Sequence, residues 1–167
     1  MSRIKYYWED LLPGSVRELG SVTPTAEETK AFAAQFDPQP FHLDEEAGRR
    51  SLFGGLCASG WHTCALAMKL MVQNFLGEVA SLGSPGLDKI RWLKPVYPGD
   101  TLNLRFTVLE ARPMRSRPDT GLVKGRQEMF NQYGEKVLEM EGYGMYRRRV
   151  PASPEEIAAL ASNSGQG

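Results

Sequence analysis

The stretch SGWHTCALAMKLMVQNFL, residues 59–76, decides the fold of this chain. Lys69 is the only formally charged residue within it. A helix that is apolar nearly all round is normally a buried helix. Both ends of the stretch are too polar for a segment that spans a bilayer. We therefore predict a long, buried helix over residues 59–76.

The hydrophobic period changes after this helix. Apolar and polar residues alternate from Leu102 to Val108, which is typical of a half-buried strand. Ile90 and Trp92 alternate in the same way before a turn-rich connector at residues 94–100. Two more strands are predicted over residues 121–130 and 136–147, and residues 112–120 read as a basic, proline-containing loop.

Short turns between these strands indicate an antiparallel sheet, because parallel strands need long crossover connections. The predicted fold class is therefore α+β. An antiparallel sheet with one wet face must cover its other face with something apolar. The helix at 59–76 is the only predicted helix long enough to do so.

The length of 167 residues fits one domain with a sizeable core. We expect that domain to occupy residues 1–150. After Val150 the composition turns to alanine, serine, glycine and glutamine. Residues 151–167 are therefore predicted to form a tail that is either a short helix, at 154–161, or loose.

The charge balance excludes several classes of partner. Twenty basic residues balance twenty acidic ones, which favours neither a nucleic-acid nor a membrane partner. The first ten residues lack the apolar core of a secretory signal. Two cysteines are too few for a disulfide framework, so we expect a reduced, cytoplasmic setting.

A metal site is not expected. Cys57, His62 and Cys64 are near one another in sequence, and His42 is the only other histidine. A structural zinc site needs four ligands at familiar spacings. Two cysteines seven residues apart beside an apolar helix are more often small core residues.

The segment DPQPFH, residues 37–42, holds two prolines between an acid and a histidine. A capping box at Thr25 and Glu28 starts a helix, and Pro38 ends it at Asp37. The prolines remove backbone freedom, so Asp37 and His42 can converge on one point and hold a water molecule between them. On spacing alone, a loop-capping aspartate and an ordinary loop histidine are the stronger reading.

Three motifs resemble one known family. The motif DPQPFHLD at 37–44, the motif FGGLCASG at 53–60 and the turn KPVYPGD at 94–100 are similar to those of MaoC-like dehydratases and R-specific enoyl-CoA hydratases. The likeness runs from about residue 9 to residue 146. It implies a hot-dog fold, in which an antiparallel sheet wraps around one long central helix. It also implies a homodimer or higher homo-oligomer, with a small-molecule acyl thioester lying along the subunit interface.

The resemblance assigns roles by position. Asp37 and His42 would activate water, and the amide of Gly60 would bind the thioester carbonyl. Phe41, Ser59 and Trp61 would contact the substrate. Two positions depart from the family pattern: Gln39 replaces an asparagine, and Ser59 replaces a histidine, where a serine is also a good helix N-cap.

The implied activity is the interconversion of a trans-2-enoyl thioester and a 3-hydroxyacyl thioester. No cofactor is implied, since the coenzyme A thioester is itself the substrate. Two alternatives stay open on the same architecture. One is an acyl-CoA thioesterase, and the other is a non-catalytic acyl-binding or scaffold subunit.

Overall fold

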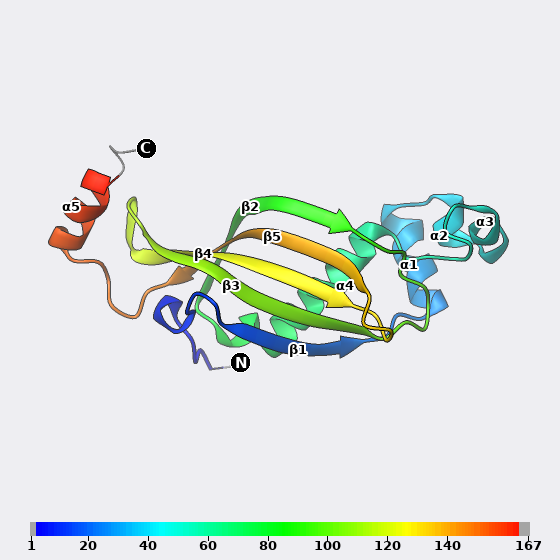
Figure 1. Cartoon of the computed structure of the whole chain (residues 1–167), viewed down its shortest axis with the longest axis horizontal. Coiled ribbons are helices and arrows are strands. Elements are labelled where there is room, and N and C mark those ends of the chain that lie inside the picture. Colours follow the sequence, from blue (N-terminus) through cyan, green and yellow to red (C-terminus); the bar gives the residue numbers. More distant parts are fainter. Residues whose placement is uncertain (1–2, 164–167) are drawn as a thin grey trace.

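The computed structural model describes residues 3–163, and its centre is a five-stranded antiparallel sheet (Figure 1). The strand order is β1-β3-β4-β5-β2, so β1 and β2 form the two edges. The strands are β1 (Val16–Val22), β2 (Ser81–Trp92), β3 (Leu102–Met114), β4 (Arg117–Phe130) and β5 (Lys136–Arg147). This topology confirms the predicted α+β class and the antiparallel sheet.

Helices flank the sheet and extend both ends of the molecule. The long helix α4 runs along one face of the sheet, the helices α1 to α3 gather at one end, and α5 lies at the other (Figure 1). The helical segments are η1 (Trp8–Asp10), α1 (Ala26–Phe36), α2 (Pro40–Leu43), α3 (Glu45–Arg50), α4 (Gly60–Asn74), η2 (Leu76–Glu78) and α5 (Pro154–Asn163). Between residues 3 and 163, none of these helices combines the length and apolarity needed to cross a bilayer.

The core lies between α4 and the sheet. Leu66, Ala67, Leu70 and Met71 of α4 are buried in one cluster with apolar strand residues, among them Leu102, Leu104, Phe106, Val108, Val123 and Leu138. The prediction that this helix covers the sheet is therefore confirmed. The prediction that it is buried all round is wrong for the single chain, because Trp61, Met68 and Val72 are 57%, 49% and 47% exposed.

Two strand predictions need correction. β2 begins at Ser81, well before the alternation at Ile90. Its first half contains Gly83 and Gly86 at positive φ, and the pairing with β5 shifts register at both, so no regular alternation marks it. Residues 112–120, predicted as a loop, instead continue β3 and β4 into a hairpin, in which Met114 pairs with Arg117.

The sheet face that α4 leaves uncovered carries paired charges. Lys136 contacts Glu128 at 2.6 Å, Lys89 contacts Glu139 at 2.9 Å, and Arg126 contacts Glu141 at 2.9 Å. Successive residues of a strand point to opposite faces, so these side chains alternate with the core residues. The wet face of the sheet is therefore a ladder of ion pairs across neighbouring strands.

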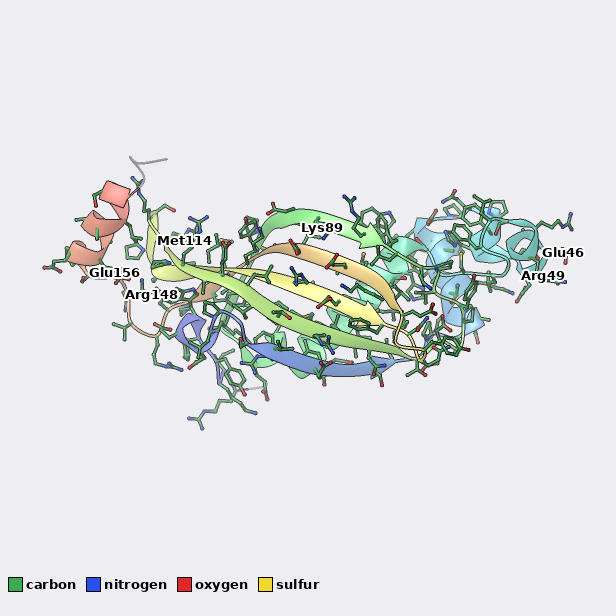
Figure 2. All side chains as sticks on the ribbon, in the orientation of Figure 1. Glu46, Arg49, Lys89, Met114, Arg148 and Glu156 are labelled. Atoms are coloured by element: carbon green, nitrogen blue, oxygen red, sulfur yellow. The ribbon has the colours of Figure 1, made fainter. Side chains whose placement is uncertain are left out.

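A cluster of contacts joins the segment after β5 to the start of the chain. The Arg148 guanidinium lies 5.0 Å from the Trp8 ring centre and donates hydrogen bonds to both carboxylate oxygens of Glu156, at 3.0 and 3.2 Å (Figure 2). The backbone N–H of Arg149 donates to Glu9 at 2.9 Å. The contact between Arg148 and Glu156 holds α5, which is the helical alternative for the tail, and residues 164–167 of that tail lie outside the described residues.

Candidate active site

Asp37 and His42 converge, as the sequence predicts. Asp37 is the C-terminal cap of α1, and its N–H donates to the carbonyl of Ala33 at 2.9 Å. Pro40 opens the short helix α2, where a fixed φ suits the first helical turn. His42 lies in that turn and is 5% exposed. Its Nε2 atom is 3.4 Å from Asp37 Oδ2.

A backbone carbonyl fixes the tautomer of His42. The Nδ1 atom lies 2.7 Å from the carbonyl oxygen of Cys57. A carbonyl only accepts hydrogen bonds, so Nδ1 carries a proton, and in the neutral form of the ring Nε2 faces Asp37 with its lone pair. The Cys57 thiol lies nearby, and burial together with the charge of Asp37 raises its pKa to about 11, so it stays protonated at neutral pH.

Both oxygens of Asp37 accept hydrogen bonds. Gln39 Nε2 donates to Oδ1, and Ser59 Oγ donates to Oδ2, each at 2.7 Å. Burial alone would raise the pKa of Asp37. The hydrogen bonds from Ser59 and Gln39, together with the positive charge of His42 when it is protonated, outweigh it, so the pKa of Asp37 lies below its ordinary value of 3.8. Asp37 is therefore ionised at neutral pH.

The amide of Gly60 is free at the start of α4. The N–H of Trp61 donates to Ser59 Oγ at 3.3 Å, which makes Ser59 the N-cap. Within residues 3–163, no group accepts a hydrogen bond from the N–H of Gly60. This N–H and the positive end of the α4 dipole can both stabilise negative charge on an oxygen atom bound there.

Trp92 requires glycine at position 60. Its indole Nε1 donates to the carbonyl oxygen of Gly60 at 2.8 Å. A Cβ atom at residue 60 would lie only 2.6 Å from Cε2 and Nε1 of that ring. The ring of Trp61 meets Trp92 edge to face, with ring centres 5.2 Å apart. The two indoles therefore pack around the first turn of α4.

These groups face one cleft of about 500 Å³. Its polar lining includes Asp37, Gln39, His42, Thr63 and Lys94. Its apolar lining includes Phe41, Phe53, Trp61, Trp92, Leu93 and Val96. Phe41 packs edge-on against His42, with ring centres 4.6 Å apart. The cleft thus brings together Asp37, His42, Gly60, Phe41 and Trp61 from the sequence prediction.

Ser59 is buried beside Asp37. It is 0% exposed in the single chain and is not among the residues that line the cleft. Its hydroxyl is used instead by Asp37 and by the Trp61 amide. The expected contact between Ser59 and the substrate stays a prediction, and the sequence alone does not show that residues 37 and 59 meet.

Sequence reasoning also missed three other parts of the site. These are the Cys57 carbonyl that orients His42, the donation from Gln39 to Asp37, and the packing of Trp92 on Gly60. No local pattern signals them, because a backbone acceptor has no residue preference and the other contacts depend on the fold. In the part of the chain that is described, no three His, Cys, Asp or Glu side chains gather in a way that could hold a metal ion.

Comparison with known proteins identifies the family. The model of the MaoC like domain matches residues 12–128. The uncharacterized protein YdeM of Bacillus subtilis is 33% identical over 129 residues, covering 77% of this chain and 89% of that protein. A mesaconyl-CoA hydratase of Cereibacter sphaeroides is 42% identical over 90 residues, covering 54% of this chain but only 25% of the hydratase.

Solved structures agree with this assignment. A MaoC-like dehydratase from Rhodospirillum rubrum has a TM-score of 0.81 and 43% identity, covering 87% of this chain and 99% of that one. The R-hydratase PhaJ1 from Pseudomonas aeruginosa has a TM-score of 0.70 and 25% identity, covering 86% of each chain. A Mycobacterium tuberculosis protein described as a double hot-dog fold matches with a TM-score of 0.68, 26% identity and coverage of 89% of this chain and 45% of that one. The chain therefore has a hot-dog fold and belongs to the MaoC-like dehydratase family.

Proposed function

We propose that this protein catalyses the reversible hydration of trans-2-enoyl thioesters to 3-hydroxyacyl thioesters. Membership of a hydratase and dehydratase family supports this general activity. The observation that carries the proposal is the approach of His42 Nε2 to Asp37 Oδ2, at 3.4 Å, inside a cleft that also contains the free Gly60 amide.

The pair is arranged to hold a water molecule. When His42 is in its neutral form it presents a lone pair at Nε2, and ionised Asp37 presents only acceptors, so in that form the two do not hydrogen-bond to each other directly. A water that donates one hydrogen to each satisfies both groups. Its oxygen lone pairs then face the cleft, where a substrate carbon can be attacked.

The reaction follows from this placement. The thioester carbonyl accepts a hydrogen bond from the Gly60 N–H. The water oxygen bonds to C3 as a proton passes to the Asp37–His42 pair, and the electrons of the C2–C3 double bond move towards the carbonyl oxygen. The developing enolate is stabilised by the Gly60 amide and the α4 dipole. The pair then returns the proton to C2, so both added hydrogens and the oxygen come from one water.

Substitution of the two polar groups tests this function. We expect Asp37→Asn and His42→Ala each to lower kcat for hydration of crotonyl-CoA by about 10²-fold or more. The loss of the enoyl double bond can be followed by ultraviolet absorbance. Asp44→Asn is the matched control, because Asp44 caps α3 through the Ala47 N–H and asparagine caps equally well. Full activity in both site variants, with the fold intact, would refute the role of the pair.

The identity of the acyl group on the substrate can be tested with a panel of thioesters. The named activity of the Cereibacter sphaeroides relative makes mesaconyl-CoA a reasonable second substrate in the panel. Each substrate should also be tested for release of free thiol. Thiol release from saturated acyl-CoAs without hydration would identify a thioesterase, and binding without either reaction would identify an acyl-binding subunit.

We also propose that two copies pair along the seam between α4 and β2. This seam is defined here by Met68 and Val72 of α4 and by Leu82 and Leu87 of β2. All four apolar side chains are exposed in the single chain. β2 is also an edge strand, whose unpaired backbone groups can bind a second strand.

A further inference from the structure

Ser59 connects Asp37 to the first turn of α4 and is not among the residues that line the cleft. The N–H of Trp61 donates to Ser59 Oγ, and the same hydroxyl donates onward to Asp37 Oδ2 at 2.7 Å. The hydroxyl has one hydrogen to give. Because Asp37 takes it, the direction of the chain is fixed from the helix amide through the serine to the carboxylate.

This contact also explains how an acid persists at the end of α1. A carboxylate at a helix C-terminus is opposed by the negative end of that helix dipole. Asp37 is bound to the N-cap of α4, so the positive end of a second, longer helix faces it. The charge that α1 disfavours is therefore stabilised by α4.

The contact selects one oxygen of Asp37. Oδ2 is the atom that lies 3.4 Å from His42 Nε2, and it is also the atom held by Ser59. Oδ1 is held by Gln39 from the other side. The titratable groups that face Asp37 are His42 and the Cys57 thiol. Ser59 is 0% exposed, so water does not compete for its hydroxyl.

We propose that Ser59 is a positioning residue for hydration: it holds the Asp37 carboxylate ionised and turned so that Oδ2 meets the water beside His42. The inference rests on the proposed function for its kinetic consequence, but the hold on Asp37 can be measured without any turnover. The same hydroxyl caps α4, so the orientation of Asp37 is coupled to that of the Gly60 amide.

The test compares Ser59→Ala and Ser59→Gly with Ser59→Thr. Ser59→Ala and Ser59→Gly both remove the hydroxyl. Because glycine is a better N-cap than alanine, an effect shared by both variants comes from the missing hydroxyl and not from the weakened cap of α4. We expect both variants to raise the pKa of Asp37. Carbon-detected NMR measures this pKa, and the Asp37→Asn variant identifies the signal of the Asp37 carboxyl carbon. We expect kcat for crotonyl-CoA to fall by about tenfold with KM little changed, and Ser59→Thr to restore both values towards wild type.

A second cap serves as the control. Thr25 caps α1 by accepting from the Glu28 N–H at 3.1 Å and lies outside the cleft. Thr25→Ala should lower thermal stability as a lost cap does, but leave the titration of Asp37 and kcat unchanged.

The outcomes separate the two ideas. An unchanged titration of Asp37 in Ser59→Ala and Ser59→Gly overturns the inference, and so does a changed titration with unchanged kcat. A wild-type protein that hydrates none of the enoyl thioesters overturns the proposed function instead. In that case the NMR titration still decides whether Ser59 holds Asp37.

Discussion

At the scale of single residues, Gly60 is constrained by its neighbour. Alanine is normally better than glycine inside a helix. At residue 60, however, the added Cβ would lie 2.6 Å from the Trp92 ring. We expect Gly60→Ala to lower the free energy of unfolding by about 1–3 kcal/mol, as overpacking does, and to reduce hydration of crotonyl-CoA. Urea unfolding and the absorbance assay measure the two effects.

The clash with Trp92 can be tested separately. Gly55→Ala is the control, because a Cβ there would meet Tyr97 at an ordinary 3.5 Å. The double variant Gly60→Ala with Trp92→Leu should recover part of the stability lost in Gly60→Ala. Equal stability of Gly60→Ala and wild type would show that the ring does not restrict this position.

His62 gives the stability of the protein a pH dependence. Its ring stacks on Phe32, with ring centres 4.7 Å apart, and its buried Nδ1 has no hydrogen-bond partner within the described residues. Burial lowers the pKa of His62 from 6.5, although Glu28 opposes this effect. Below that pH the unfolded chain gains a proton that the folded chain resists, so stability falls as the pH drops through 6.5.

The variant His62→Phe removes the titratable imidazole and keeps an aromatic ring that can stack on Phe32. We expect its advantage over wild type in urea unfolding to be larger at about pH 5.5 than at about pH 8. The measurement is the free energy of unfolding at the two pH values. Parallel curves for both proteins would contradict a role for His62 in this dependence.

The sequence predicts the proximity of Asp37 and His42 better than it predicts the contacts that support them. Asp37 and His42 are separated by a short segment with two prolines, so local stiffness allows them to converge, and the resemblance to the family favours that they do. The bonds from Ser59 to Asp37 and from Trp92 to Gly60 span 22 and 32 residues. Such contacts depend on the packing of α1, α4 and β2 together, which no local pattern describes.

At the scale of elements, the face of α4 that packs on the sheet contributes to the core. Leu70 of α4 is 3% exposed, whereas Leu52, in the turn that follows α3, is fully exposed. We expect Leu70→Ala to cost about 2–5 kcal/mol of unfolding free energy. The same change at Leu52 should cost about 0.5 kcal/mol or less. Urea unfolding compares the two, and equal losses would contradict the placement of the core.

Elements with strong local signals were predictable, and β2 was not. The helix at residues 26–36 begins at a capping residue and ends before a proline, so both of its ends follow from sequence. The first half of β2 contains Gly83, Pro85 and Gly86, which are poor strand formers. Its pairing with β5 comes from the assembled sheet, so the pattern of its own residues could not reveal it.

At the scale of the whole molecule, the seam between α4 and β2 predicts an assembly. Light scattering after size exclusion should give a mass of two chains or a multiple of two. Leu87→Lys places a charge in the seam and should shift the protein towards the single chain. Leu52→Lys makes the same change outside the seam and should have no effect on mass. A monomeric wild type at micromolar concentration would contradict the proposed pairing.

The contacts around Arg148 have a consequence for rearranging the chain. Glu9 and Arg149 stand near opposite ends of the sequence but are joined by hydrogen bonds. A short linker between these two segments would therefore close the backbone into a ring. The exposed turn between Met114 and Arg117 then offers a place to cut it, which would give a circularly permuted protein with its sheet and cleft unchanged.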